Sequence, residues 1–365
     1  MPSNEQPQLS DVLKADFFPS LDGLRGIAII LVVFSHLKFQ PYIIFNGALG
    51  VDVFFVLSGF LITSLCIKEK NNNGDISLKK FYIRRALRIF PVAYLYLFLL
   101  AILNSIYHLD ITWFQFLGAA LYLTNASYFR AHSFSWFTGH FWSLAVEEQF
   151  YLIFPFLLKK QSKLYFGFII FIVFILPILC YLQYQIPGLN KGLFYLLTHY
   201  FIKFQGIAIG CLFSILAFHK TLDSNTFFKY KLTVNIIAIL LVFTLRYNDF
   251  FSINSVFNNF SISLLLGYLI VTNITPSTDF IFKGLNSKIL TTIGKLSYSI
   301  YIWQSLFTSN GFVSNSNELP YIISHYPYNL IWIIVIPSCS YYFYEKFFLN
   351  LKNRFKANSK AAVRA

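Results

Sequence analysis

Residues 21–37 read LDGLRGIAIILVVFSHL, a stretch that is apolar enough to enter a bilayer and yet contains Arg25 and His36. An arginine in the middle of a spanning helix costs roughly 2.5 to 3.5 kcal/mol on insertion scales, so intramembrane ionisable residues usually mark a functional site. Eleven positions on an α-helix make three turns and about 20°, which places both side chains on one face, roughly 16 Å apart along the axis. The stretch therefore predicts a spanning helix with a cation near one end and an imidazole near the other.

The composition of the rest of the chain agrees with a membrane protein. Of 365 residues, 56% are hydrophobic, 20% are aromatic and only 12% are charged, which is too apolar for a soluble domain of this size. No polar block is large enough to form a separate soluble domain. We therefore expect a single all-α polytopic membrane domain over residues 1–365. The first sixteen residues lack a basic segment followed by a short apolar core, so we expect no cleavable signal peptide.

Apolar segments long enough to be helices recur along the chain. The candidate spans are 20–38, 48–67, 88–107, 112–126, 139–158, 164–184, 196–218, 231–246, 256–274, 289–309 and 327–349. The segment 112–126 is short, and we expect it to be a half-span or a surface helix. The prediction is thus a bundle of about ten transmembrane helices plus one short helix.

A model with ten crossings places most of the basic loop residues on one side of the membrane. Seven Lys/Arg residues lie in 68–88, and further basic residues fall on the same side, including those of the tail 351–365. This asymmetry predicts that both termini, 1–18 and 351–365, are cytoplasmic. The net charge of +14 then needs no nucleic-acid partner. The four cysteines have no metal-ligand or disulfide spacing, and we expect no metal.

Other helices add polar residues. Asp52 enters the second predicted helix at about the expected depth of His36, where a carboxylate needs a partner. Arg84, Arg85 and Arg88 cluster before the third predicted span, and arginine forks of this kind suit phosphate oxygens. The alternative for these arginines is a positive-inside anchor that reaches lipid headgroups.

The stretch GHFWSLAVEEQFYLIFP, residues 139–155, carries acidic residues inside an apolar helix. His140, Ser143 and Glu147 share one helical face, whereas Glu148 points about 100° away. We therefore expect Glu147 to face the same pocket as its polar neighbours. The alternative is a structural ion pair between Glu147 and an arginine of another helix.

Five stretches taken in order resemble the membrane-bound acyltransferase-3 family, whose members O-acetylate cell-surface glycans. They are LDGLRGIAIILVVFSH, VDVFFVLSGFLIT, FYIRRALRIFP, GHFWSLAVEEQFYLIFP and KLSYSIYIWQ, and they cover nearly the whole chain. The family's Arg-(ten residues)-His signature matches Arg25 and His36. Its Arg-x-x-Arg element matches Arg85 and Arg88, and its tryptophan-serine-leucine-x-x-glutamate element matches Trp142, Ser143, Leu144 and Glu147.

The resemblance implies a bacterial inner membrane, an acyl-coenzyme A donor, most often acetyl-CoA, and an acceptor hydroxyl outside the cytoplasm. The chain departs from the family at Gln304, where a histidine is common, and at Glu345–Phe347, where a proline is missing from the last helix. The glutamine argues against position 304 being an indispensable base in this chain. Many relatives carry an extracytoplasmic hydrolase-like domain that we do not find, so any second transfer step would need a partner protein.

The mechanism that follows is a hypothesis. Arg85, Arg88 and also Arg84 would hold the phosphates of coenzyme A at the cytoplasmic face, and Arg25 would hold the donor partway along the bundle. Neutral His36 would be the general base on the acceptor hydroxyl. The further residues fall in two groups: Asp52 or Glu147 would orient the imidazole, and Trp142, Ser143, Tyr298 and Gln304 would line the acceptor and oxyanion region. An acyl-enzyme on Ser143 or a tyrosine stays open.

A transporter or flippase of a lipid-linked sugar or hydrophobic anion is the competing prediction, because it too would explain intramembrane charge. Against it, no internal repeat of the transporter kind is found. The acceptor is left open among O-antigen of lipopolysaccharide, capsule, exopolysaccharide, peptidoglycan and small molecules.

Overall fold

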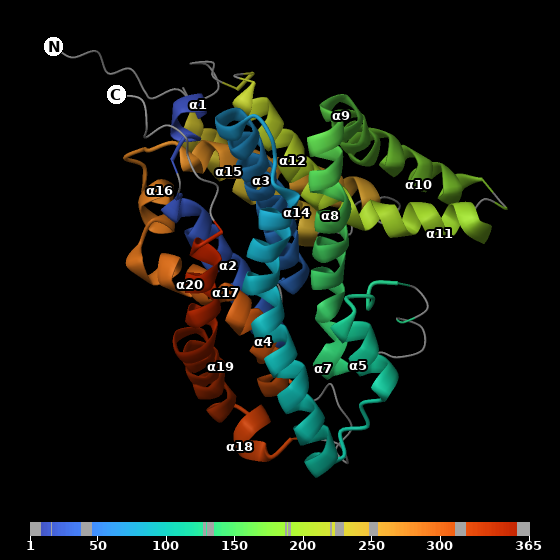
Figure 1. Ribbon diagram of the computed structural model, residues 1–365, viewed down its shortest axis with the longest axis vertical. Coiled ribbons are helices and arrows are strands. Elements are labelled where there is room, and N and C mark those ends of the chain that lie inside the picture. Colours follow the sequence, from blue (N-terminus) through green and yellow to red (C-terminus); the bar gives the residue numbers. More distant parts are fainter. Residues whose placement is uncertain are drawn as a thin grey trace. The chain divides into compact units, whose positions relative to one another are not determined.

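The computed structural model describes residues 9–15, 17–37, 46–126, 129, 135–186, 188, 191–219, 221–222, 230–247, 255–310 and 319–355. Regular structure within these ranges is entirely helical, without a strand (Figure 1). The predicted all-α class is therefore confirmed. Of the predicted cytoplasmic termini, residues 1–8, 16 and 356–365 lie outside the described residues.

The helices follow the predicted apolar segments closely. The first half of the chain forms α1 (Leu9–Val12), α2 (Pro19–His36), α3 (Gly47–Asn73), α4 (Leu78–Tyr107), α5 (Trp113–Ala120), α7 (Trp136–Gly139), α8 (Phe141–Lys160), α9 (Ser162–Ile170), η1 (Phe171–Ile175) and α10 (Leu176–Gln185). The second half forms α11 (Gly192–Phe201), η2 (Ile202–Phe204), α12 (Gln205–Phe218), α14 (Lys231–Tyr247), α15 (Ser255–Ile274), α16 (Phe280–Leu285), α17 (Lys288–Phe307), α18 (Tyr321–Ser324), α19 (Tyr328–Cys339), η5 (Ser340–Glu345) and α20 (Lys346–Asn353).

Seven helical stretches among the described residues are long and apolar enough to cross a membrane. They are Pro19–His36, Gly47–Asn73, Leu78–Tyr107, Trp136–Lys160, Ser162–Gln183, Gly192–Phe218 and Val256–Ile274. The chain is thus a multi-pass membrane protein, whereas the number of about ten crossings stays a prediction. Helix α5 has 8 residues and is about 12 Å long, too short to cross a hydrocarbon core of about 30 Å. It matches the expected half-span or surface helix.

The predicted basic loop 68–88 is mostly helical, which corrects the sequence prediction. Helix α3 continues to Asn73, and α4 begins at Leu78, where the Ser77 side chain caps it by accepting from the Lys80 amide at 3.5 Å. Only four residues separate the two helices, with Gly74 at φ 78° allowing the turn. The three arginines at 84, 85 and 88 consequently lie inside α4, as does Pro91.

The described chain divides into two compact units, each assembled from separate segments. Unit 1 comprises 1–28, 48–74 and 157–294, and unit 2 comprises 29–47, 75–156 and 295–365. In unit 1, α15 packs against both α12 and α14, and α10 packs against α11. In unit 2, α4 packs against α20, η5 and α5. Helices α2, α8 and α17 each contribute residues to both units.

Glycines let two helices of unit 1 approach each other at backbone distance. A Cβ on Gly59 of α3 would lie 1.9 Å from the Ile207 carbonyl oxygen of α12. A Cβ on Gly210 of α12 would lie 2.0 Å from the Val56 carbonyl oxygen of α3. Small residues at such crossings are typical of membrane bundles, because close packing replaces the hydrophobic effect as the force between helices in lipid. Helices α3 and α12 are therefore closely packed in unit 1.

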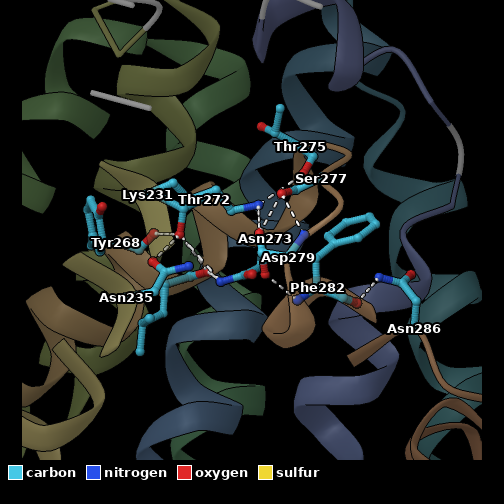
Figure 2. Close-up of polar contacts among 11 residues, drawn as sticks. Lys231, Asn235, Tyr268, Thr272, Asn273, Thr275, Ser277, Asp279, Phe282 and Asn286 are labelled. Carbon is cyan, nitrogen blue, oxygen red and sulfur yellow. Dashed lines mark hydrogen bonds and ion pairs between the residues drawn. The ribbon is translucent and has the colours of Figure 1, made fainter. Parts of the chain in front are cut away.

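A buried polar cluster fixes the ends of α14, α15 and α16 in unit 1 (Figure 2). The Lys231 ammonium lies 3.3 Å from Asp279 Oδ2, 3.4 Å from the Thr275 carbonyl oxygen and 5.2 Å from the Phe282 ring centroid. The Thr272 hydroxyl donates to Asn235 Oδ1 at 3.0 Å. Because Asp279 also caps α16 by accepting from the Phe282 amide at 2.8 Å, one carboxylate holds two helix ends.

The charge of Asp279 is stabilised by its neighbours. Burial disfavours the carboxylate, but hydrogen bonds from the Ser277 hydroxyl and the Phe282 amide, together with the Lys231 ammonium, outweigh it and hold the pKa of Asp279 below its ordinary value. A carboxyl group with a lowered pKa stabilises the folded state above its unfolded pKa, and this contribution disappears as the pH falls through its folded pKa.

We expect Asp279→Asn to lower the free energy of unfolding by about 3 kcal/mol, since it leaves the Lys231 charge buried without its partner. Asparagine caps a helix as well as aspartate does, so this variant tests the charge and not the cap. Thermal unfolding in detergent measures the effect. Adding Lys231→Met should recover part of the loss, because no unpaired charge then stays buried. A melting temperature for Asp279→Asn equal to that of the unmodified chain would show that the ion pair contributes nothing.

Candidate active site

Arg25 lies on α2 within unit 1 and is ion-paired inside its own helix. Its Nη1 atom lies 2.9 Å from Asp22 Oδ1, three residues earlier, and the two side chains are 19% and 9% exposed. Asp22 lies in the first turn of α2, where a negative charge is favourable next to the helix N-terminus. Asp22 was not among the predicted site residues, although its three-residue spacing from Arg25 is a recognisable pairing signal.

His36 is the last residue of α2 and lies in unit 2, where Gln304 of α17 meets its ring. His36 Nδ1 and Gln304 Oε1 are 2.8 Å apart. The indole of Trp136 lies against the imidazole edge-to-face, with ring centroids 5.0 Å apart. The Trp136 Nε1–H donates to the Ser305 carbonyl oxygen at 3.0 Å, so α7 and α17 hold the aromatic neighbour of His36 in place.

Asp52 or Glu147 was predicted to orient the His36 ring, and the structure places Gln304 at its Nδ1 atom. Asp52 lies in unit 1, where its Oδ2 atom is 3.2 Å from Arg246 Nη2 of α14. Glu147 lies in unit 2, and its Oε2 atom accepts from the Tyr151 hydroxyl at 3.3 Å, one turn along α8. The orienting role of either carboxylate stays a prediction.

A second group of polar side chains joins α8 to α17 inside unit 2. Ser143 Oγ lies 2.6 Å from the Tyr301 hydroxyl, which lies 3.1 Å from the His140 carbonyl oxygen. The His140 ring is buried among Tyr96, Phe141 and Tyr301, with centroid distances of 5.4, 4.8 and 5.7 Å. Ser143, expected as an oxyanion donor, is therefore bonded to a tyrosine that the predicted site did not include.

The arginines of α4 have different surroundings. Arg84 Nη1 donates to the Phe355 carbonyl oxygen at 2.9 Å, beyond the end of α20. The Arg85 guanidinium lies over the Tyr151 ring at 4.4 Å from its centroid and interacts electrostatically with Glu148. Arg88 follows Arg85 by three residues on the same helix face, and all three side chains are half-buried.

Tyr298 and Trp142 are the remaining residues of the predicted site. The Tyr298 hydroxyl donates to the Ile89 carbonyl oxygen of α4 at 2.9 Å, one residue beyond Arg88. Trp142 is half-buried in the first turn of α8. Within unit 2 the structure thus brings α4, α8 and α17 together around Tyr298, Arg85 and Glu147, and it joins His36 to Gln304.

Sequence reasoning missed Ser305 and gave His140 no role of its own. Ser305 Oγ lies 2.9 Å from His140 Nδ1 and accepts from Gln304 Nε2 at 3.2 Å. The available signal was the continuation of polar residues past Gln304 to Ser305, Thr308 and Ser309 in an otherwise apolar helix end. A four-residue spacing also places Tyr301 and Ser305 on one face of the helix.

Comparisons with known proteins identify the family of the chain. Residues 18–344 match the protein family described as Acyltransferase domain. A Staphylococcus aureus (strain COL) protein provisionally named an O-acetyltransferase is 32% identical over 361 residues, covering 91% of this chain and 57% of the relative. Peptidoglycan O-acetyltransferase OatA of Listeria monocytogenes is 30% identical over 309 residues, covering 79% of this chain and 49% of the relative.

O-acetyltransferase OatA of Staphylococcus aureus (strain NCTC 8325 / PS 47) is 30% identical over 324 residues, covering 83% of this chain and 52% of the relative. The chain spans about half the length of the curated relatives it matches. No solved structure matches it. Because the family match extends over nearly the whole chain, this multi-pass membrane protein belongs to the acyltransferase-3 family.

Proposed function

We propose that the chain is a membrane O-acetyltransferase that moves an acetyl group from cytoplasmic acetyl-CoA to a hydroxyl of an extracytoplasmic or lipid-linked glycan. The observation that carries the proposal is the imidazole of His36, which lies at the end of a spanning helix with one nitrogen bonded to Gln304 at 2.8 Å. The second nitrogen is left to act on a substrate hydroxyl. A neutral imidazole is the side chain best suited to general-base catalysis near neutral pH.

The donor side of the proposal rests on arginine. Arg85 and Arg88 on one face of α4 supply two guanidinium groups, which bind phosphate oxygens through paired hydrogen bonds. Arg84 is the third candidate, although its bond to the Phe355 carbonyl oxygen also anchors the end of α20. Coenzyme A carries phosphates at one end and the acyl thioester at the other, so the phosphates and the acyl group would be held at different depths of the bundle.

Arg25 and His36 fit such a donor because of their positions on α2. The helix rises about 1.5 Å per residue, so the two residues are separated by roughly 16 Å along its axis and face the same side. We assign Arg25 to the donor arm and His36 to the reacting end. The Asp22 carboxylate at 2.9 Å orients the Arg25 guanidinium, which leaves the other N–H groups of the fork for a ligand.

In the proposed reaction the acceptor oxygen attacks the thioester carbonyl while His36 removes the hydroxyl proton. The carbon–sulfur bond breaks, and coenzyme A leaves as the thiol after receiving a proton. Ser143, Tyr298 and Trp142 are assigned to the region where charge develops on the carbonyl oxygen, with Gln304 behind His36. The relatives named peptidoglycan O-acetyltransferase and O-acetyltransferase favour a surface glycan as the acceptor, and both termini are assigned to the cytoplasm of a bacterial cell.

Purified protein in liposomes should convert acetyl-CoA to free coenzyme A in the presence of a glycan acceptor, and the rate should increase with acceptor concentration. Thiol release measured with a colorimetric reagent follows the reaction. Denatured protein in the same liposomes is the control. Movement of a labelled lipid-linked sugar between leaflets without any release of coenzyme A would instead support a transporter.

A further inference from the structure

Glu148 of α8 carries a carboxylate oxygen whose hydrogen-bonding capacity is unused. Its Oε1 atom is buried and accepts no hydrogen bond from the part of the chain that the structure describes. Arg85 of α4 and the neighbouring Glu147 interact with the carboxylate electrostatically. An ionised carboxylate can only accept hydrogen bonds, and a buried acceptor left unpaired costs free energy. Glu148 thus offers an acceptor that a donor group of a ligand would satisfy.

The Tyr122 side chain lies beside this carboxylate. It is 6% exposed, and its hydroxyl interacts with Glu148 and Tyr298 but makes no hydrogen bond of ordinary geometry within the described ranges. Tyr298 donates its one hydroxyl hydrogen to the Ile89 carbonyl oxygen at 2.9 Å, so it has none left for Glu148. An acceptor and a hydroxyl donor therefore lie close together, each without a matching partner.

The backbone holds Tyr122 in a conformation that few residues of its size adopt. Its φ is 54°, in the left-handed region that bulky side chains rarely occupy. Gln149, the residue after Glu148, fixes this segment to α8 by donating from Nε2 to the Tyr122 carbonyl at 2.8 Å and to Asn125 Oδ1 at 2.9 Å. Asn125 Nδ2 donates back to Gln149 Oε1 at 2.6 Å. Strained residues held in this way are concentrated at functional sites.

The pair formed by Glu148 and Tyr122 lies farther along α4 than Arg85. The Tyr122 ring packs against Phe90, with ring centroids 5.7 Å apart. Phe90 follows Arg85 by five positions, which is about 7.5 Å along the helix axis. On α8 the order agrees, because Tyr151, whose ring lies under the Arg85 guanidinium, is one turn away from Glu148. A ligand whose phosphates are bound at Arg85 could thus extend along α4 to this pair.

A secondary amide has the complementary chemistry, because it presents one N–H donor and one carbonyl acceptor. In coenzyme A the arm between the diphosphate and the thiol contains such amides, and the first of them is close to the diphosphate. We propose that Glu148 Oε1 accepts from the N–H of this first amide and that the Tyr122 hydroxyl donates to its carbonyl oxygen. This assignment rests on the proposed function and deepens it. Both residues bind the arm of the donor and neither reaches the thioester.

A coenzyme A analogue with an ester oxygen in place of the N–H of that amide tests the assignment on the unmodified chain. Isothermal titration of the full-length protein in detergent gives the dissociation constants of coenzyme A and of the analogue. We expect the analogue to bind about 10-fold more weakly, because it lacks the N–H that donates to a charged oxygen. Equal affinities for the two ligands would overturn the proposal.

Two variants assign the effect to its residues. Glu148→Leu should bind coenzyme A and the ester analogue equally, because the oxygen that recognises the N–H is absent. Tyr122→Phe should bind both about 5-fold more weakly and keep the preference for coenzyme A, since both ligands retain the carbonyl. Tyr94→Phe is the matched control, because its hydroxyl donates at 3.0 Å to the Ala120 carbonyl just before the Tyr122 segment. Both dissociation constants should be unchanged in this control.

The results separate this inference from the proposed function. A preference for coenzyme A that persists in Glu148→Leu would contradict the role of Glu148. An unmodified chain that transfers acetyl groups but binds both ligands equally would overturn the amide site alone. Failure of the unmodified chain to bind coenzyme A would contradict the proposed function, and the amide site with it.

Discussion

His36→Ala is expected to reduce acetyl transfer at least about 100-fold, because general-base catalysis by a positioned side chain contributes roughly 10²- to 10⁴-fold. The variant keeps α2 and loses one ring that packs on Trp136 at 5.0 Å, so the protein should still reach the membrane. Binding of acetyl-CoA should be little changed, since the proposed donor contacts are arginines. The measurement is the initial rate of transfer in membranes, normalised to the amount of folded protein.

The matched control for this variant is His219→Ala. His219 is an exposed histidine at the C-terminal end of α12, outside the proposed site, so its loss should leave the rate unchanged. Transfer by His36→Ala at more than about half of the unmodified rate would exclude His36 as the general base.

Replacing Arg85 and Arg88 together with glutamine is expected to weaken acetyl-CoA binding by about 100-fold. Two charge-assisted bonds to phosphate at roughly 1.5 kcal/mol each give about this loss. The maximal rate at saturating donor should fall much less, since neither arginine is assigned to the reacting atoms. Isothermal titration of the purified variant with coenzyme A gives the dissociation constant.

Removing two positive charges elsewhere at the start of α4 controls for a general electrostatic effect. Lys79 and Lys80 lie in the first turn of α4, and their double replacement with glutamine should leave the dissociation constant nearly unchanged. A melting temperature measured for each variant accounts for the lost contact between Arg85 and the Tyr151 ring, whose centroid is 4.4 Å away. Equal affinities of both double variants for coenzyme A would contradict donor binding by Arg85 and Arg88 and would support the alternative that they are membrane anchors.

The helices of this protein were largely predictable because their signal is local. Apolar runs of spanning length placed α2, α14 and α15 within a few residues of their observed bounds. The start of α4 was not predicted, because the basic segment from Leu78 to Arg88 is helical in structure but too charged to read as part of a span. Hydropathy reports where a helix enters the bilayer and not where it begins.

The partners of the polar residues were less predictable, because they come from distant segments. The stretch around Arg25 and His36 stood out by spacing and insertion cost alone. Gln304, however, is 268 positions away from His36, and Asp52 pairs with Arg246 through packing that sequence does not encode locally. The ion pair of Arg25 with Asp22 is the exception, since a three-residue spacing on one helix is visible in the sequence.

The same contrast holds for the hydrogen bonds that join His36, Gln304, Ser305 and His140 in unit 2. Each of these residues was visible as a polar position in an apolar helix, yet the contact between Ser305 and His140, which lie 165 positions apart, follows from packing. Helix periodicity gives the face on which a side chain lies. It does not say which donor meets which acceptor.

Mass spectrometry of surface glycans tests the central proposal most directly. Cells that express the unmodified chain, cells that express His36→Ala at an equal level and cells that lack the chain would be compared for O-acetyl groups that mild base removes. We predict acetylated glycan only with the unmodified chain. Equal acetylation in all three would contradict the proposal that this protein transfers acetyl groups to a glycan with His36 as the base.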